Sequence, residues 1–107
     1  MFRIPQISPK EAKEKLEQKN GFIIIDVRED NELRVANIKE AQHIRMSEIP
    51  RKINDLPKGK EIGLLCHTGQ RSGQVTIFLR QRGFNAINIQ GGIDFWSRSV
   101  DPSIPRY

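Results

Sequence analysis

An unbroken run of aromatic and β-branched residues, Phe22-Ile23-Ile24-Ile25, is the feature that most constrains the fold of this chain. A strand with one face in water alternates apolar and polar residues, whereas a strand covered on both faces can be apolar throughout. The run therefore predicts a strand in the middle of a parallel sheet. Two more apolar segments, at 62–65 and 84–89, are candidate strands of the same sheet.

Helix signals fall between these segments. Ser8, Pro9 and Glu11 form the capping signature of a helix that runs to about residue 19. The segment at 3–7 is a short strand candidate, expected at a sheet edge because Pro5 cannot donate to a strand ladder. Strands that alternate with helices indicate a parallel α/β sheet. The predicted helices lie at 9–19, 32–34, 47–56, 73–82 and from residue 92 onward.

The length and composition suit one soluble domain spanning residues 1–107. The chain is 36% hydrophobic and 29% charged, and its 107 residues are enough for one core but not for two. No segment approaches the length of a membrane span, and residues 1–10 lack the apolar stretch of a signal peptide. A single cysteine excludes an internal disulfide, so we expect a reducing, cytoplasmic setting.

The basic balance of the chain, a net charge of +5, does not indicate a nucleic-acid surface. Lysines and arginines are scattered among acidic residues, and no basic run carries interleaved aromatic residues. The excess charge would instead help to gather small anions. We expect neither a metal ion nor a cofactor, because the only thiol and imidazole groups, Cys66, His43 and His67, match no usual zinc spacing.

The strand at 62–65 leads into the only cysteine, Cys66, and the chain then changes character. The next six residues are small, polar or cationic, and a helix-like run begins at Gly73. Backbone amides of such a loop can converge on one point, where the helix N-terminus adds partial positive charge. A thiol in that place loses its proton more readily, and the thiolate is the reactive form. Arg71 would add a full charge and planar donors suited to an oxyanion.

Taken alone, a cysteine at the end of an apolar run is more often a buried, inert residue than a nucleophile. The loop reverses this balance, because a strand that merely turned would not need glycine, arginine and serine in register after the cysteine. The sequence therefore favours a reactive Cys66. Its substrate-binding loop would consist of His67, Thr68, Gly69, Gln70, Arg71 and Ser72.

Two charged residues, Asp26 and Arg28, follow the apolar run at 22–25. Groups just past the carboxyl ends of parallel strands face the ligand crevice, so both are expected near the Cys66 loop. They either shape the anion site or form ion pairs that hold loops and the next short helix together. The second alternative is favoured, because charged pairs near a site more often support the scaffold than take part in the chemistry.

Three segments in the same order resemble motifs of the rhodanese-type sulfurtransferases. Cys66 to Ser72 is similar to the family's active-site loop, C-x-x-G-x-R-S, and the segment 26–29 is similar to its D-V-R-E motif. The segment 91–96 resembles its G-G-x-x-x-W ending, with Trp96 expected to pack in the core. The resemblance implies a rhodanese-like three-layer α/β fold, in which helices cover both faces of a central parallel sheet of about five strands.

The resemblance covers about 7–96 and leaves 97–107 as an irregular C-terminal extension. The segment 36–41 departs from the family's usual G-H-I-P-G-A. Asn37, Lys39 and Glu40 stand where His, Pro and Gly are usual, which changes the rigidity expected of this turn and any partner contact that it makes.

The spacing between cysteine and arginine separates two kinds of reaction. Arginine-cradled cysteine phosphatases place five residues between them, because their loop surrounds a tetrahedral phosphate or arsenate. Here four residues separate Cys66 from Arg71, and the resemblance implies that this shorter loop goes with sulfur transfer. The phosphatase or arsenate-reductase alternative also lacks an obvious loop acid to protonate a leaving alcohol.

The resemblance implies that Cys66 takes sulfane sulfur from thiosulfate or another persulfide donor and passes it to a thiol or to cyanide. Loop amides and Arg71 would hold the persulfide, with His67 and Thr68 as specificity residues and Asp26 and Arg28 in support. No second cysteine exists to resolve it, so the sulfur must leave to another molecule. The alternatives are an enzyme with small-molecule acceptors or a relay to a protein partner. A binding module with an incidental cysteine is disfavoured, because the regulatory domains that resemble rhodaneses usually lose the cysteine, whereas this sequence keeps it.

Overall fold

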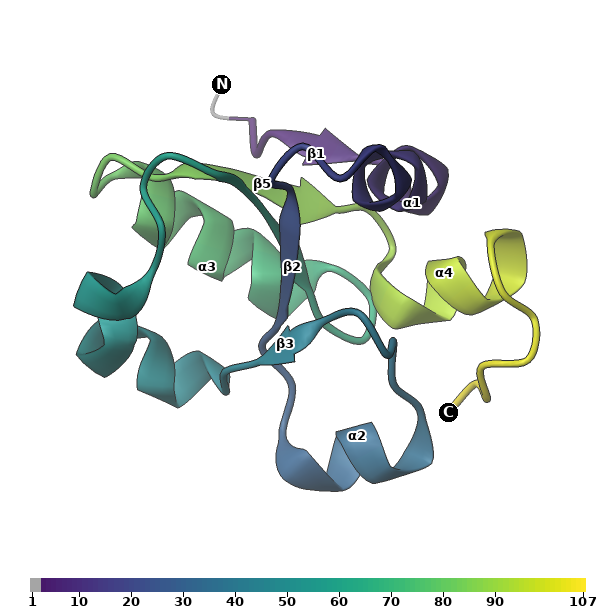
Figure 1. Cartoon of the computed structure of the whole chain (residues 1–107). Coiled ribbons are helices and arrows are strands. Elements are labelled where there is room, and N and C mark those ends of the chain that lie inside the picture. Colours follow the sequence, from purple (N-terminus) through teal and green to yellow (C-terminus); the bar gives the residue numbers. More distant parts are fainter. Residues whose placement is uncertain (1–2) are drawn as a thin grey trace.

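Five parallel strands form one sheet in the computed structural model, which describes residues 3–107 (Figure 1). Their order across the sheet is β1-β5-β4-β2-β3, so β4 is central and β1 and β3 are the edges. The predicted α/β class with about five parallel strands is therefore confirmed. Met1 and Phe2, the first residues of the domain predicted at 1–107, lie outside the described residues. The strands are β1 (Gln6–Ile7), β2 (Ile23–Asp26), β3 (Gln42–His43), β4 (Glu61–Leu65) and β5 (Asn85–Ile89).

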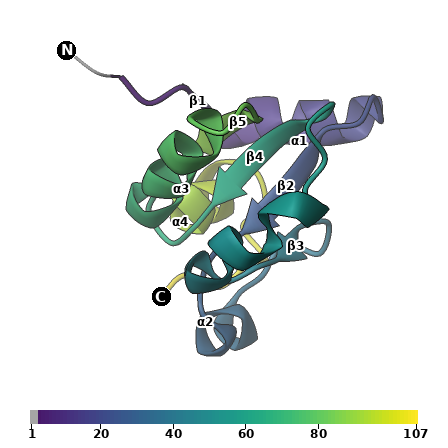
Figure 2. The same ribbon diagram turned by 90° about the vertical axis from the view of Figure 1, so that its left-hand side faces the viewer.

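Helices cover both faces of the sheet, as the family resemblance implied. α1 and α4 lie on one face, and α3 and the 3₁₀ helix η1 lie on the other (Figure 1). In Figure 2 the left-hand side of the view in Figure 1, where α3 and η1 lie, faces the viewer. α2 stands beyond the carboxyl end of β2. The bounds are α1 (Pro9–Gln18), α2 (Asp30–Val35), η1 (Met46–Asp55), α3 (Gln70–Arg80) and α4 (Gly92–Ser99).

Each face of the sheet has its own apolar core. On the side of α1 and α4, Ala12 and Trp96 are buried against Ile24 of β2 and Ile89 of β5. The core position predicted for Trp96 is confirmed, since its side chain is 2% exposed. On the other side, cluster members include Ile49 of η1, Val75 and Leu79 of α3, Ile25, Leu64 and Cys66. The strands of the sheet are thus buried from both sides, which accounts for the apolar run at 22–25.

The start of α1 follows its capping signature. The Ser8 hydroxyl accepts from the Glu11 amide at 3.1 Å, and the Glu11 carboxylate accepts from the Ser8 amide at 3.1 Å. Pro9 occupies the first helical position, where a missing amide hydrogen costs nothing. The helix ends at Lys19, which adopts a left-handed conformation and donates to the carbonyl of Leu16.

Three helices differ in extent or type from the prediction. α3 begins at Gln70 instead of Gly73, because Gly69 has a φ of 103° and turns the chain directly into the helix. The segment predicted at 47–56 is 3₁₀ in type, and Pro50 inside it has no amide hydrogen for regular α-helical bonding. α4 continues to Ser99, so the C-terminal extension is shorter than 97–107. Within residues 3–107, no helix combines the length and apolar character needed to cross a bilayer.

Candidate functional site

Cys66 lies just past the carboxyl end of the central strand β4, at the mouth of the short turn into α3. Its Sγ atom accepts a hydrogen bond from the Gly69 amide at 3.1 Å and lies 3.2 Å from the Ser72 hydroxyl oxygen. The residue is 1% exposed. Because Gly69 is the N-cap of α3, the sulfur sits at the partly positive end of that helix, which favours a thiolate.

The N-terminus of α4 fixes the backbone of this turn. The amides of Ile93 and Asp94 donate to the carbonyls of Cys66 and His67 at 2.9 and 3.1 Å. Gly92, with a φ of 61°, permits this approach, since a side-chain carbon there would collide with both carbonyl oxygens. The two helix termini therefore have different partners: α3 faces the sulfur, and α4 holds the loop carbonyls.

The side chain of Asn88, in β5, forms hydrogen bonds to two residues of the Cys66 loop. Its side-chain amide donates to the carbonyl of Gly69 at 3.0 Å, and its side-chain carbonyl accepts from the Ser72 hydroxyl at 2.6 Å. Asn88 is 4% exposed and Ser72 is fully buried. One strand residue thus binds both loop residues that contact the Cys66 sulfur.

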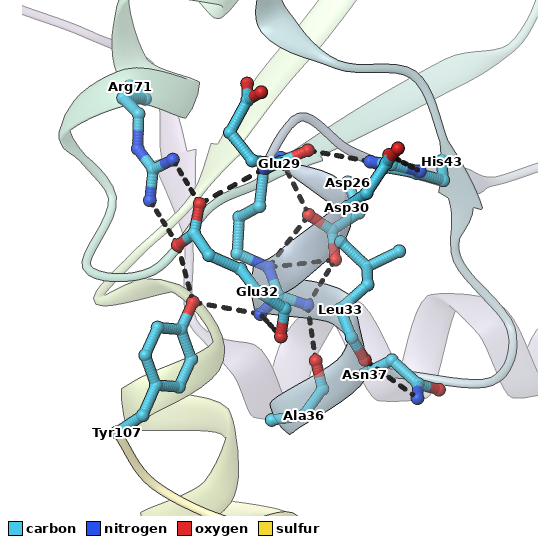
Figure 3. Close-up of polar contacts among 11 residues, drawn as sticks. Asp26, Glu29, Asp30, Glu32, Leu33, Ala36, Asn37, His43, Arg71 and Tyr107 are labelled. Atoms are coloured by element: carbon cyan, nitrogen blue, oxygen red, sulfur yellow. Dashed lines mark hydrogen bonds and ion pairs between the residues drawn. The ribbon is translucent and has the colours of Figure 1, made fainter.

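Arg71 projects from the first turn of α3 and forms a two-point ion pair with Glu32 of α2. The nitrogen–oxygen distances are 2.7 and 2.8 Å, and Figure 3 shows the Glu32 carboxylate between Arg71 and Tyr107. The hydrogen bonds from Arg71 lower the pKa of Glu32 from 4.5 to about 2. The guanidinium charge predicted for the site is thus partly offset by a carboxylate of the neighbouring helix.

The C-terminal residues return to this site. The Tyr107 hydroxyl donates to Glu32 at 2.8 Å and accepts from Arg28 at 2.9 Å. The Tyr107 ring stacks on the His67 ring with centroids 4.0 Å apart, and His67 Nε2 lies 2.8 Å from the backbone oxygen of Tyr107. One residue of the extension therefore joins the Cys66 loop, α2 and the end of β2.

Asp26 and Arg28 form a buried ion pair at 2.7 Å. The Arg28 guanidinium also donates to the carbonyls of Glu32, within α2, and Ala36, directly after α2. These bonds connect the end of β2 to α2. Neither residue has a hydrogen bond to Cys66 among those described in residues 3–107. The geometry matches the scaffold alternative, in which the pair holds loops and the short helix together.

The remaining loop residues form the rim. Thr68 and Gln70 are exposed, and Thr68 lines a surface cavity of about 370 Å³ together with Gly91 and Asp94. His43, the other histidine, lies in β3 and bonds the carbonyl of Arg28 at 2.7 Å, away from the loop. The structure thus brings together Cys66, Gly69 and Ser72, whereas the Arg71 guanidinium binds Glu32. Thr68 and Gln70 are exposed beside His67.

Three residues at the site were not predicted from the sequence: Glu32, Asn88 and Tyr107. Asparagine is uncommon within strands, so Asn88 in an apolar strand pattern was a usable signal. Glu32 was placed only in a short helix, and Tyr107 in an irregular tail. No local pattern marks these two, because their contacts span 39 and 79 residues of the sequence.

Comparisons with known proteins agree with this geometry. The family model described as rhodanese-like domain matches residues 8–99. The chain is 40% identical over 101 residues to the Bacillus subtilis protein named "Putative sulfurtransferase YtwF", covering 94% of this chain and 98% of that protein. It is 34% identical to "Putative sulfur carrier protein YrkF" of the same organism, covering 92% of this chain and 54% of that protein.

Solved structures show the same fold. The crystal structure of SSP1007 from Staphylococcus saprophyticus superposes with a TM-score of 0.82 at 34% identity, covering 96% of this chain and all of that one. Sequence, fold and site geometry therefore agree, and the chain belongs to the rhodanese-like domain family.

Proposed function

We propose that this protein transfers sulfane sulfur from a donor to an acceptor through a persulfide on Cys66. The observation that carries the proposal is the position of the Cys66 sulfur, which accepts a hydrogen bond from the Gly69 amide at the N-terminus of α3. A sulfur atom held there is stabilised as an anion, both before and after it carries a second sulfur.

The reaction has two balanced halves. The Cys66 thiolate attacks the outer sulfur of thiosulfate, a new sulfur–sulfur bond forms, and sulfite leaves with the electron pair of the broken bond. An acceptor thiolate then attacks the outer sulfur of the persulfide, and the Cys66 thiolate is released. With cyanide as the acceptor, the product is thiocyanate. Another persulfide can replace thiosulfate as the donor by the same bond exchange.

The proposed roles of the other residues follow from their contacts. The Gly69 amide binds the sulfur, and Arg71 adds positive charge that its pairing with Glu32 reduces but does not remove. His67, Thr68 and Gln70 form the rim and would discriminate between donors. The Asp26–Arg28 pair supports the loop from the end of β2.

A sulfur relay to a protein partner is the second candidate. Cys66 is the only cysteine, so the persulfide sulfur must pass to another molecule. The similarity to a protein named as a sulfur carrier supports an acceptor that is itself a protein. Either function requires Cys66 to stay reduced, which suits a reducing compartment such as the cytoplasm. Either function also suits a single domain over residues 1–107.

Steady-state assays separate these candidates. With thiosulfate and cyanide, the wild-type protein should form thiocyanate and Cys66→Ala should form none. Turnover only when a persulfide-carrying protein replaces thiosulfate would favour the relay. Hydrolysis of an aryl phosphate or reduction of arsenate, without sulfur transfer from any donor, would overturn the proposal in favour of phosphatase or arsenate-reductase chemistry.

A further inference from the structure

Asn88 and Ser72 form a buried hydrogen-bond chain that ends at the Cys66 sulfur. The Asn88 side chain lies under the loop, with its amide nitrogen 3.0 Å from the Gly69 carbonyl oxygen. Its amide oxygen lies 2.6 Å from the Ser72 hydroxyl, which in turn lies 3.2 Å from Cys66 Sγ. All three side chains are buried, so water does not supply alternative partners.

The number of available protons determines which group donates and which accepts in each hydrogen bond from Asn88 to Cys66. A carbonyl can only accept, so the Gly69 carbonyl requires the NH₂ group of Asn88 on its side. The side-chain oxygen of Asn88 therefore faces Ser72, and Ser72 must donate to it. A hydroxyl has one proton, and this proton is committed to Asn88 at the shorter of the two Ser72 distances.

The sulfur consequently faces a lone pair of the Ser72 oxygen. A protonated Cys66 satisfies that arrangement, because its S–H can donate to Ser72. A thiolate does not, since the hydroxyl must rotate toward the sulfur and leave the buried oxygen of Asn88 without a donor. An unpaired buried acceptor carries a free-energy cost, which the thiolate state alone bears.

We infer that Asn88 is a positioning residue that holds the Ser72 proton away from the sulfur and so raises the pH at which Cys66 becomes a thiolate. Ser72 acts as a two-position switch, bonded to Asn88 in the thiol state and to the sulfur in the thiolate state. The inference concerns ionisation of Cys66 and does not depend on which sulfur donor reacts with it.

Other charged groups surround the loop and are left in place by changes at Asn88. They are Arg71 of α3 paired with Glu32 of α2, the Asp26–Arg28 pair after β2, His67 of the loop stacked on Tyr107, and Asp94 of α4. A change at Asn88 therefore tests the hydrogen bonds that join Asn88, Ser72 and Cys66, provided that its effect on the ionisation of the Cys66 thiol requires the Ser72 hydroxyl.

The test is the pH dependence of alkylation of Cys66 by iodoacetamide, followed by intact mass. Cys66 is the only cysteine, so the readout is unambiguous and requires no sulfur donor. Asn88→Leu frees the Ser72 proton and should increase the alkylation rate about fivefold at a fixed pH below the midpoint. Asn88→Ala also removes the acceptor of the Ser72 proton and should move the midpoint in the same direction as Asn88→Leu.

Two further variants make the result specific. Asn85→Leu, at an exposed position of the same strand, should leave the midpoint unchanged. In a Ser72→Ala background, Asn88→Leu should have no further effect on the midpoint. Equal shifts with and without the Ser72 hydroxyl, or an unchanged midpoint in Asn88→Leu, would overturn the inference. If Asn88→Leu does not fold, Asn88→Ala decides, and a midpoint at or above the wild-type value overturns the inference.

Discussion

At the scale of single residues, the site is a set of pairs whose members come from different elements. Arg71 of α3 meets Glu32 of α2, and the Tyr107 hydroxyl joins that pair to Arg28. Residue types alone predicted the nucleophile and the cationic loop, because cysteine, glycine, arginine and serine occupy fixed positions after an apolar strand. They did not predict Glu32, since an acidic residue on a short helix has many equally plausible partners along the sequence.

Glu32→Gln should lower the free energy of unfolding by about 1 kcal/mol at pH 7, because it removes one charge of a two-point ion pair. The pKa of Glu32 is about 2 when folded, against an ordinary value of 4.5. A lowered folded pKa stabilises the protein above the unfolded value, and that stabilisation is lost as the pH falls through the folded value. Urea denaturation should therefore show the difference between wild type and variant shrinking between pH 5 and pH 2.

Glu17→Gln, at an exposed position of α1, is the matched control and should show no such pH dependence. A wild-type advantage over Glu32→Gln that persists undiminished to pH 2 would contradict the assignment of the lowered pKa to this ion pair.

At the scale of elements, two helix N-termini and a central strand build the loop. Periodicity and capping signals predicted α1 closely, because its start depends on contacts between residues three apart. The same signals placed the start of α3 three residues too late. The helix begins directly after Gly69, which has a positive φ, and a glycine in a polar segment is equally typical of a loop. The anchoring of the loop by α4 depends on tertiary contacts and had no local signal.

Gly92→Ala should destabilise the protein by about 3 kcal/mol, because the new side chain meets the carbonyl oxygens of Cys66 and His67 at a left-handed φ. Thermal unfolding measures the loss. Gly59→Ala is the control, since nothing lies within 4 Å of its new carbon, and it should change stability by less than about 0.5 kcal/mol. Equal melting temperatures for Gly92→Ala and wild type would show that α4 does not constrain the loop.

At the scale of the whole molecule, the chain end closes onto the site. The extension after α4 passes Ile104, which is buried in the core shared by α1 and α4, and brings Tyr107 beside His67. The alternation of strands and helices predicted the sheet and its parallel sense, but a segment with Pro102 and Pro105 has no periodicity from which to predict a path. Its position depends on contacts 40 to 79 residues away.

Tyr107→Phe should lower the free energy of unfolding by about 1 kcal/mol, because the buried Arg28 guanidinium loses an acceptor and Glu32 loses a donor. The ring and its stacking on His67 are retained in this variant, whereas Tyr107→Ala removes both contributions and should cost more. Urea denaturation of the two variants measures each loss. Equal stability of wild type, Tyr107→Phe and Tyr107→Ala would show that the extension does not hold the site.

The central claim is that Cys66 carries sulfur, and intact mass after treatment with a sulfur donor tests it most directly. Thiosulfate, and in parallel a persulfide donor, should add one sulfur atom, about 32 Da, to the wild-type protein and nothing to Cys66→Ala. The added mass should disappear when an acceptor thiol is supplied. No mass gain with any donor, or an equal gain in Cys66→Ala, would contradict a persulfide on this residue.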